Sequence, residues 1–269
     1  MLRRYSSSRK LSDNIKLGVL TAFSAGMVNV SSLIIFFAFT SNVTGHYAIL
    51  AQEISKGNWY QATIVFLWIC LFFTGSFISI ACIVNNRMAE RYFAHALPLL
   101  LEMACILFVG FYLQNLYSET LWETELLVAV MILAMGLQNG LTASISNSVV
   151  KTTHLTGLTT YLAIVMSMLL KKENRSDKNL KDKAFLLYSI LGGYMTGGIL
   201  SGWVYLKVQN NVFFVVLLVL SIVLVYDLYM LRLRKLIIRK QPFIRKTYVK
   251  ADPAMHLGDH PTLIKVNNF

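Results

Sequence analysis

The sequence is poor in charged residues, and this scarcity restricts the class of protein that it can form. Asp, Glu, Lys and Arg make up 14% of its 269 residues, whereas hydrophobic residues make up 56%. Soluble domains have about a quarter charged residues and roughly half apolar ones. Because the chain also has a positive mean hydropathy, it is not an ordinary soluble globule. We predict an integral membrane protein, with the lipid bilayer as a partner.

Cysteines and catalytic motifs are equally scarce. The three cysteines, Cys70, Cys82 and Cys105, lie in apolar segments without a Cys-x-x-Cys spacing, so neither a disulfide framework nor a metal site is indicated. The chain has no Gly-x-Ser-x-Gly, no His-Glu-x-x-His, no P-loop and no Rossmann glycine string, which are the motifs of common enzyme sites. We therefore expect a protein that is not an enzyme and that has no cofactor.

The charges that are present gather in three basic clusters beside apolar segments. One precedes the first apolar segment, one has six Lys and Arg between Lys171 and Lys183, and one has eight between Arg232 and Lys250. They lack the aromatic residues of a nucleic-acid-binding face, so we expect no nucleic-acid partner, and they predict cytoplasmic segments. The first apolar segment has about 25 residues and no small-residue cleavage site, which favours a retained helix over a signal peptide.

Eight apolar segments can be marked along the chain. They are 15–39, 43–55, 60–84, 94–115, 124–147, 153–170, 183–206 and 212–231. A helix needs about 20 residues to cross a hydrocarbon core of about 30 Å, and six segments reach that length. Segment 43–55 contains Gln52 and Glu53 and is too short, and segment 153–170 is ambiguous.

Lysine and arginine in short loops favour the cytoplasm, which helps to choose between two topologies. If all eight segments cross, four basic residues face outward; if 43–55 and 153–170 only enter and return, Lys56 and Lys207 are the basic residues outside. We therefore favour six crossings with two short or re-entrant helices, and eight crossings remain the alternative. Three crossings and one re-entrant helix per half would invert the second half relative to the first.

A motif that occurs twice indicates such halves. Gly26-Met27-Val28-Asn29 is followed by Val43-Thr44-Gly45-His46, and Gly136-Leu137-Gln138-Asn139 is followed by Lys151-Thr152-Thr153-His154-Leu155-Thr156-Gly157. A pattern that recurs after about 110 residues predicts internal duplication. We place the first repeat at about 14–115 and the second at about 124–231, with polar backbone meeting near the middle of the membrane.

The repeated polar residues are the candidates for a binding site. If each Thr-Gly pair opens a half-helix inside the membrane, its free N–H groups and dipole favour an anionic group such as a carboxylate; the alternative is that Thr caps an interfacial helix and Gly lets helices touch. The amides of Asn29, Gln138 and Asn139 either join helices or line a polar site. The candidate substrate-binding residues are Asn29, Thr44, Gly45, His46, Gln138, Asn139, Thr153, Thr156 and Gly157.

Three further features of the apolar segments are distinctive. Glu102 lies between Leu101 and Met103 in the middle of segment 94–115, and a carboxyl group there is a candidate proton carrier or a structural, amide-paired group. His46 and His154 adjoin the Thr-Gly pairs, but two histidines without a third ligand do not indicate a metal site. Segment 183–206 has small residues on one helical face, which predicts a packing surface. They are Gly192, Gly193, Gly197, Gly198 and Gly202.

These motifs resemble the YoaK-like family of bacterial inner-membrane proteins, also called domain of unknown function 1275. The resemblance covers about 14–232. It is most specific where 136–139 and 152–157 match the family's Gly-x-Gln-Asn and Thr-Thr-x-x-Thr-Gly patterns. The first half matches less closely, since Asn29 replaces the family's usual Asp and His46 replaces its usual Asn. The resemblance implies a multi-pass inner-membrane protein of unassigned activity.

Together, these features predict an all-α, polytopic helical bundle with two repeats. We expect a cytoplasmic segment 1–13, a transmembrane domain 14–232 and a basic cytoplasmic tail 233–269. The favoured function is a small-solute transporter or channel, with another copy of the chain as a candidate partner. The alternatives are a membrane assembly or sensor protein that acts through its basic tail and an intramembrane lipid-modifying enzyme, which lacks a recognisable nucleophile and base.

Overall fold

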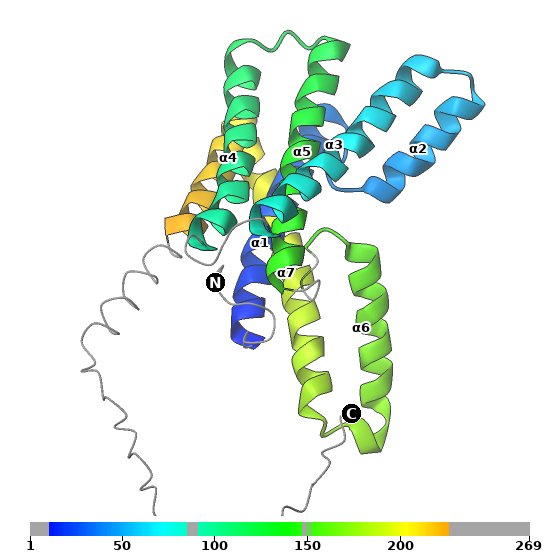
Figure 1. Cartoon of the computed structure of the whole chain (residues 1–269), viewed down its shortest axis with the longest axis vertical. Coiled ribbons are helices and arrows are strands. Elements are labelled where there is room, and N and C mark those ends of the chain that lie inside the picture. Colours follow the sequence, from blue (N-terminus) through cyan, green and yellow to red (C-terminus); the bar gives the residue numbers. More distant parts are fainter. Residues whose placement is uncertain (1–10, 85–90, 147–149, 151, 226–269) are drawn as a thin grey trace, which may run out of the picture. The chain divides into compact units, whose positions relative to one another are not determined.

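The computed structural model describes residues 11–84, 91–146, 150 and 152–225, all within the first of the chain's two units, Met1–Met230. The described residues form helices and their connections, with no strand among them, which confirms the predicted all-helical membrane bundle (Figure 1). The predicted tail 233–269 and residues 1–10 of the predicted N-terminal segment lie outside the described residues.

The helices follow the apolar segments closely. They are α1 (Leu11–Phe36), α2 (Val43–Ser55), α3 (Trp59–Val84), α4 (Arg91–Asn115), α5 (Leu121–Ser146), α6 (Leu155–Leu170), α7 (Lys178–Val208) and a helix over 212–225, with 3₁₀ turns η3 (Lys172–Asn174) and η4 (Gln209–Asn211). Five stretches among the described residues are long and apolar enough to cross a membrane. The last of them, Lys178–Val225, combines α7 with the helix that follows η4.

Helices α2 and α6 are the short ones, as the sequence predicts. They have 13 and 16 residues, so at 1.5 Å per residue they extend about 20 Å and about 24 Å, less than a hydrocarbon core of about 30 Å. Figure 1 shows that they run in opposite directions, α2 toward its turn with α3 and α6 toward its turn with α7.

Two helix ends differ from the sequence prediction for local reasons. Helix α1 ends at Phe36 and not at residue 39, because Phe37 takes a left-handed conformation with φ of 54°. Helix α7 begins at Lys178, five residues before the predicted segment, because Asp177 caps it by accepting a hydrogen bond from Asn179 N. The first turns of α7 are therefore a charged extension of an apolar helix.

The largest helix interfaces join α1 to α7 and α3 to α5. Glycines bring these backbones close together: Gly197 of α7 lies against the Phe23 carbonyl of α1, and Gly136 of α5 lies against the Phe72 carbonyl of α3. Small residues let helices approach closely in a membrane in this way. The predicted glycine face of α7 is only partly a packing surface, however, because a Cβ added at Gly192 or Gly202 would meet no atom of the described residues within 4 Å.

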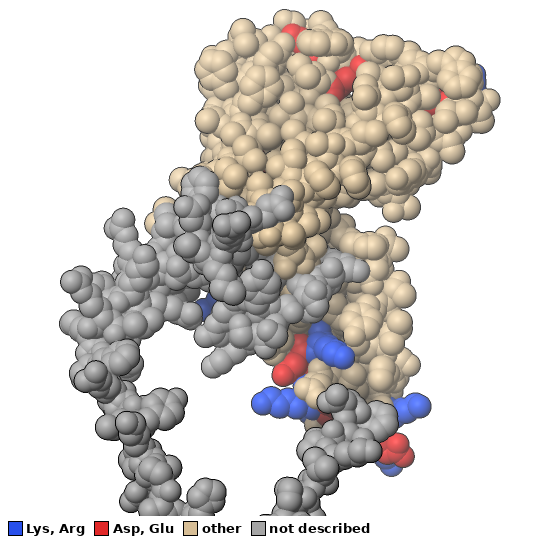
Figure 2. All heavy atoms as spheres, in the orientation of Figure 1, with Lys and Arg blue, Asp and Glu red and all other residues tan. Residues whose placement is uncertain are grey.

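Charged side chains gather at opposite ends of the described helices. Figure 2 shows Lys and Arg beside some acidic groups where α6 and α7 are joined, and acidic groups, all of them Glu, where α4 and α5 are joined. Between these ends the visible surface carries almost no charge, which suits a surface in contact with lipid. At the α2–α3 turn, hydrogen bonds from Lys56 and then Asn58 lower the pKa of Glu53 below its usual value.

Candidate functional site

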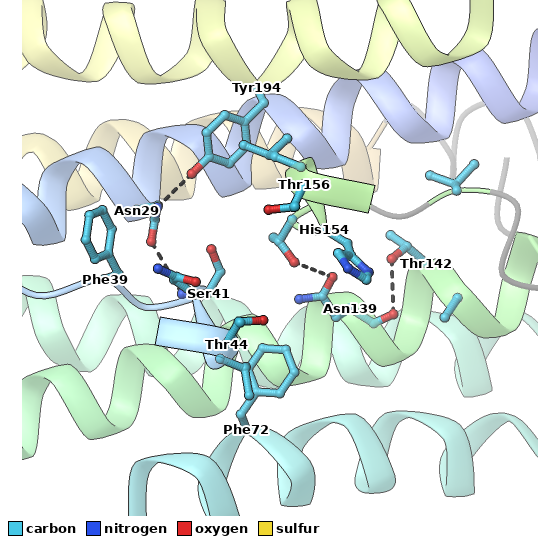
Figure 3. A pocket seen from close by; sticks show the side chains of 16 residues that line it. Asn29, Phe39, Ser41, Thr44, Phe72, Asn139, Thr142, His154, Thr156 and Tyr194 are labelled. Atoms are coloured by element: carbon cyan, nitrogen blue, oxygen red, sulfur yellow. Dashed lines mark hydrogen bonds between the residues drawn. The ribbon is translucent and has the colours of Figure 1, made fainter. Parts of the chain in front are cut away.

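A cavity of about 550 Å³ lies where α2 and α6 begin, and residues of both halves of the chain line it (Figure 3). Its lining comes from α1, α2, α3, α5, α6, α7 and the connections before the two short helices. The lining residues are Asn29, Phe39, Ser41, Asn42, Val43, Thr44, Phe72, Asn139, Thr142, Ala143, Val150, Thr153, His154, Leu155, Thr156 and Tyr194. The two Asn residues of the repeated motif therefore border one space.

On one side of the cavity, Asn29 holds the connection between α1 and α2. Its Oδ1 accepts hydrogen bonds from Thr40 N at 2.9 Å, Thr40 Oγ1 at 3.1 Å and Ser41 N at 3.3 Å. Its Nδ2 donates to Tyr194 Oη of α7 at 2.7 Å. One amide thus satisfies two buried backbone N–H groups, which are costly to leave without a partner, and it ties α1 to α7.

On the other side, Asn139 has the corresponding position next to the connection between α5 and α6. Its Oδ1 accepts a hydrogen bond from Thr153 Oγ1 at 2.8 Å, and its Nδ2 donates to the Met135 carbonyl one turn earlier in α5. Thr142 donates to the carbonyl of Asn139, also on α5. Figure 3 shows the labelled side chains in two groups, one around Asn29 and one around Asn139.

The N-termini of α2 and α6 both open onto the cavity, since Val43, Thr44, Leu155 and Thr156 line it. The α2 terminus is capped, because Asn42 Oδ1 accepts a hydrogen bond from Gly45 N at 3.1 Å. His154 at the matching place before α6 makes no capping hydrogen bond with its side chain. Uncapped N–H groups and the helix dipole make such a terminus a favourable place for a negatively polarised atom.

The cavity lining combines polar and apolar side chains, and among the described residues it carries no Asp, Glu, Lys or Arg. The side-chain oxygens of Asn29 and Asn139 are already used to hold the two connections. The hydroxyl groups of Thr44 and Thr156 remain beside the helix N-termini. These hydroxyl groups and the helix N-termini offer hydrogen-bond donors, so the arrangement suits a small solute with hydrogen-bond acceptors.

Four predicted site residues lie beside the cavity and outside its lining. Gly45 and Gly157 follow the caps, and a Cβ at these positions would lie 2.6 Å from Asn42 Nδ2 and 3.2 Å from His154 Nε2, respectively. These glycines therefore leave room for the residue that precedes each short helix. His46 is buried, contacts Trp68 and pairs through Nε2 with the Phe39 carbonyl at 3.0 Å.

The fourth, Gln138, points away from the cavity, although Asn139 next to it lines the cavity. Gln138 Nε2 donates to Ser24 Oγ of α1 at 2.6 Å and to Glu102 Oε1 of α4 at 3.0 Å. Glu102, the predicted proton-carrying residue, is fully buried and lies in this cluster, outside the cavity lining. Consecutive residues on a helix lie about 100° apart, so Gln138 and Asn139 face different neighbours.

Sequence reasoning missed several lining residues, and some of them had a signal. Residues 40–45 (Thr-Ser-Asn-Val-Thr-Gly) match 152–157 (Thr-Thr-His-Leu-Thr-Gly) position by position, which pairs Ser41 with Thr153 and Asn42 with His154. Tyr194 had no such signal, because it lies on the glycine-rich helix that the sequence indicated only as a packing surface.

The described fold and cavity define a polytopic helical membrane protein with a cavity bordered by two short helices. A family model described as "protein of unknown function (DUF1275)" matches residues 17–226, and the chain belongs to this family. No curated protein matches the chain, and no solved structure matches it.

Proposed function

We propose that this protein binds a small polar solute in the cavity between α2 and α6 and moves it across the membrane. The observation that carries the proposal is that both short helices begin at one cavity, each next to an Asn of the long helix before it. Transporters commonly bind solute where interrupted helices of two related halves meet, with helix N-termini directed at the solute. The solute that fits best carries hydrogen-bond acceptors, and a small carboxylate is the clearest example.

The packing of the helices supports two related halves, and the opposite directions of α2 and α6 in Figure 1 support an inverted relation between them. The first helix of each half, α1 or α5, packs against the third helix of the other half, α7 or α3. Ser76 of α3 donates to the Gly136 carbonyl of α5, and Ser201 of α7 donates to the Met27 carbonyl of α1, both at 3.0 Å. In this proposal one half rocks against the other and exposes the cavity to each side of the membrane in turn.

Solute binding can be tested with purified protein and a panel of short-chain carboxylates, amino acids, inorganic anions and uncharged polyols. A ligand at about one hundred times its Kd stabilises the folded state by about 2.7 kcal/mol, so we expect a rise in melting temperature with a carboxylate. Thr156→Val should raise the ligand concentration needed for the same rise in melting temperature about tenfold, because it removes a donor worth about 1.4 kcal/mol.

Thr159→Val is the matched control for that panel, because Thr159 is exposed on the same helix and lies outside the cavity lining. It should leave the ligand response unchanged. A melting temperature that ignores every compound in the panel contradicts the proposed function, and equal loss of response in both variants contradicts the proposed place of binding.

The inverted arrangement predicts the side of the membrane for three positions. We expect a cysteine at Lys56 or Glu119 to react with a membrane-impermeant thiol reagent added outside intact cells, and a cysteine at Arg87 to react only after the cells are opened. The background should carry Cys70→Ala, Cys82→Ala and Cys105→Ala. In an eight-crossing protein all three results reverse, so the labelling pattern decides between the two topologies.

A further inference from the structure

A buried cluster away from the cavity joins three helices through Glu102, Gln138 and Ser24. All three residues have 0% exposure. Gln138 Nε2 of α5 donates both to Glu102 Oε1 of α4 and to Ser24 Oγ of α1, and Ser24 Oγ donates to the Thr21 carbonyl at 3.0 Å. The cluster is therefore a polar contact between α1, α4 and α5 inside an apolar core.

No cation neutralises Glu102 within the described core. Helix α4 packs against α3, α5 and η4, and neither 59–84 nor 209–225 contains Asp, Glu, Lys, Arg or His. The acidic residues of α5 lie in its first turns, and on α1 Lys16 precedes Ser24 by two helical turns. Cys105 on α4 itself is a titratable group close to Glu102, and it is also an acid. An ionised carboxylate in such a place is costly, and a neutral carboxylic acid is much less so.

Two oxygens of the cluster lack a hydrogen-bond partner among the described residues, Glu102 Oε2 and Gln138 Oε1. Both are acceptors as an ionised carboxylate and an amide present them, so what the cluster lacks is a donor. The other polar atoms of the two groups are already paired, because Gln138 Nε2 donates a hydrogen bond to Glu102 Oε1. A carboxylic acid and an amide pair fully when the acid also donates its O–H to the amide oxygen.

We propose that Glu102 is a proton-binding site, closed by Gln138, that couples proton movement to solute movement through the cavity. The coupling rests on the proposed function. A proton from water on one side binds Glu102 Oε2, and the same proton returns to water on the other side, so no other bond forms or breaks. A sodium ion fits less well, because hard cations collect about six oxygen ligands and two unpartnered oxygens are found here.

The path from this site to the cavity is short and runs along α5. Gln138 belongs to the proton site, and the next residue, Asn139, lines the cavity and holds Thr153 before α6. Once Glu102 loses its proton, its charge needs water, so the contact between α1, α4 and α5 must open. That movement changes the position of Asn139 and with it one wall of the cavity.

Proton binding itself can be tested without a solute. We expect infrared spectra of the protein in lipid at neutral pH to contain the carbonyl band of a neutral carboxylic acid, which Glu102→Gln removes. Glu125→Gln is the control, because Glu125 is another acid of low exposure, but it accepts hydrogen bonds from Tyr60 Oη and Gln61 Nε2. If Glu102→Gln leaves the spectrum unchanged, the proton site is overturned.

Coupling to the cavity can be tested with Ala143→Cys, which places a thiol in the cavity lining, in a background without the native cysteines. The labelling rate with a small thiol reagent is measured at about pH 5 and about pH 9, with Glu102 present and with Glu102→Gln. The change in rate between the two pH values should be about tenfold larger when Glu102 is present. Replacing sodium by choline should leave this pH effect unchanged.

The outcomes separate the two proposals. The same pH response in both proteins, or an effect that requires sodium, overturns the coupled proton site and leaves the cavity in place. A thiol at position 143 that never reacts contradicts the cavity as a route for solute, and a band that Glu102→Gln removes still supports proton binding in that case.

Discussion

Gly197→Ala is expected to destabilise the folded protein by about 3 kcal/mol, because it inserts a methyl group between two helix backbones. A Cβ at this position would overlap the Phe23 carbonyl oxygen and lie 2.9 Å from the Phe23 Cα. These atoms belong to the backbone of α1 and cannot rotate away as a side chain can. The two helices must therefore separate, and the hydrogen bond from Ser201 to the Met27 carbonyl across the same interface would lengthen.

Gly202→Ala, five residues later on α7, is the matched control. No atom of the described residues lies within 4 Å of its Cβ position, and alanine favours helix over glycine by about 1 kcal/mol. The apparent melting temperature in detergent, measured by loss of the monodisperse peak in size-exclusion chromatography, should fall for the variant at 197 and hold or rise for the variant at 202. Equal melting temperatures would show that α1 and α7 are not packed as closely as described.

Asn29→Leu is expected to cost about 2 to 4 kcal/mol of stability and to abolish the response to a bound solute. The substitution leaves the N–H groups of Thr40 and Ser41 without their acceptor, and a buried unsatisfied group costs about 1 to 3 kcal/mol. It also removes the donor to Tyr194 Oη. The connection before α2 would then no longer be held at the cavity.

Asn29→Asp should keep most of the stability and of the ligand response that Asn29→Leu loses. A carboxylate accepts the hydrogen bonds from Thr40 and Ser41, and Tyr194 Oη can donate to it in place of accepting, so the same four contacts are available. Melting temperature and ligand response should therefore stay near those of the unchanged protein. If aspartate at position 29 is as damaging as leucine, the role of Asn29 as an acceptor for the connection is wrong.

The sequence predicts the helices well because membrane insertion restricts them strongly. Lipid offers no hydrogen-bond partners, so a long apolar segment must form a helix, and the segments 60–84 and 94–115 correspond closely to α3 and α4. The short helices were predictable for the same reason, since 43–55 is too short to cross. The ends of α1 and α7 were not, because each depends on one residue, Phe37 in a left-handed conformation or Asp177 as a cap.

The sequence predicted residues of the site only where a sequence motif occurs twice. Asn29 and Asn139 were found because their surroundings occur twice, and both border the cavity. Gln138 was grouped with them because it is an amide inside a long apolar helix, yet the helical rotation of one residue directs it to Glu102 and Ser24, where it joins helices. Tyr194 reaches Asn29 from 165 positions away, a contact that depends on how α7 packs on α1 and that no local pattern encodes.

The crossed pairing of α1 with α7 and of α3 with α5 has a consequence for biosynthesis. When the ribosome has made the first half, Gly26 of α1 and Gly75 of α3 still lack the backbones on which they pack. The surfaces at these two glycines are covered only as the second half enters the bilayer: α5 covers α3, and later α7 covers α1. The earliest helix therefore completes its packing only when almost the last one has entered the bilayer.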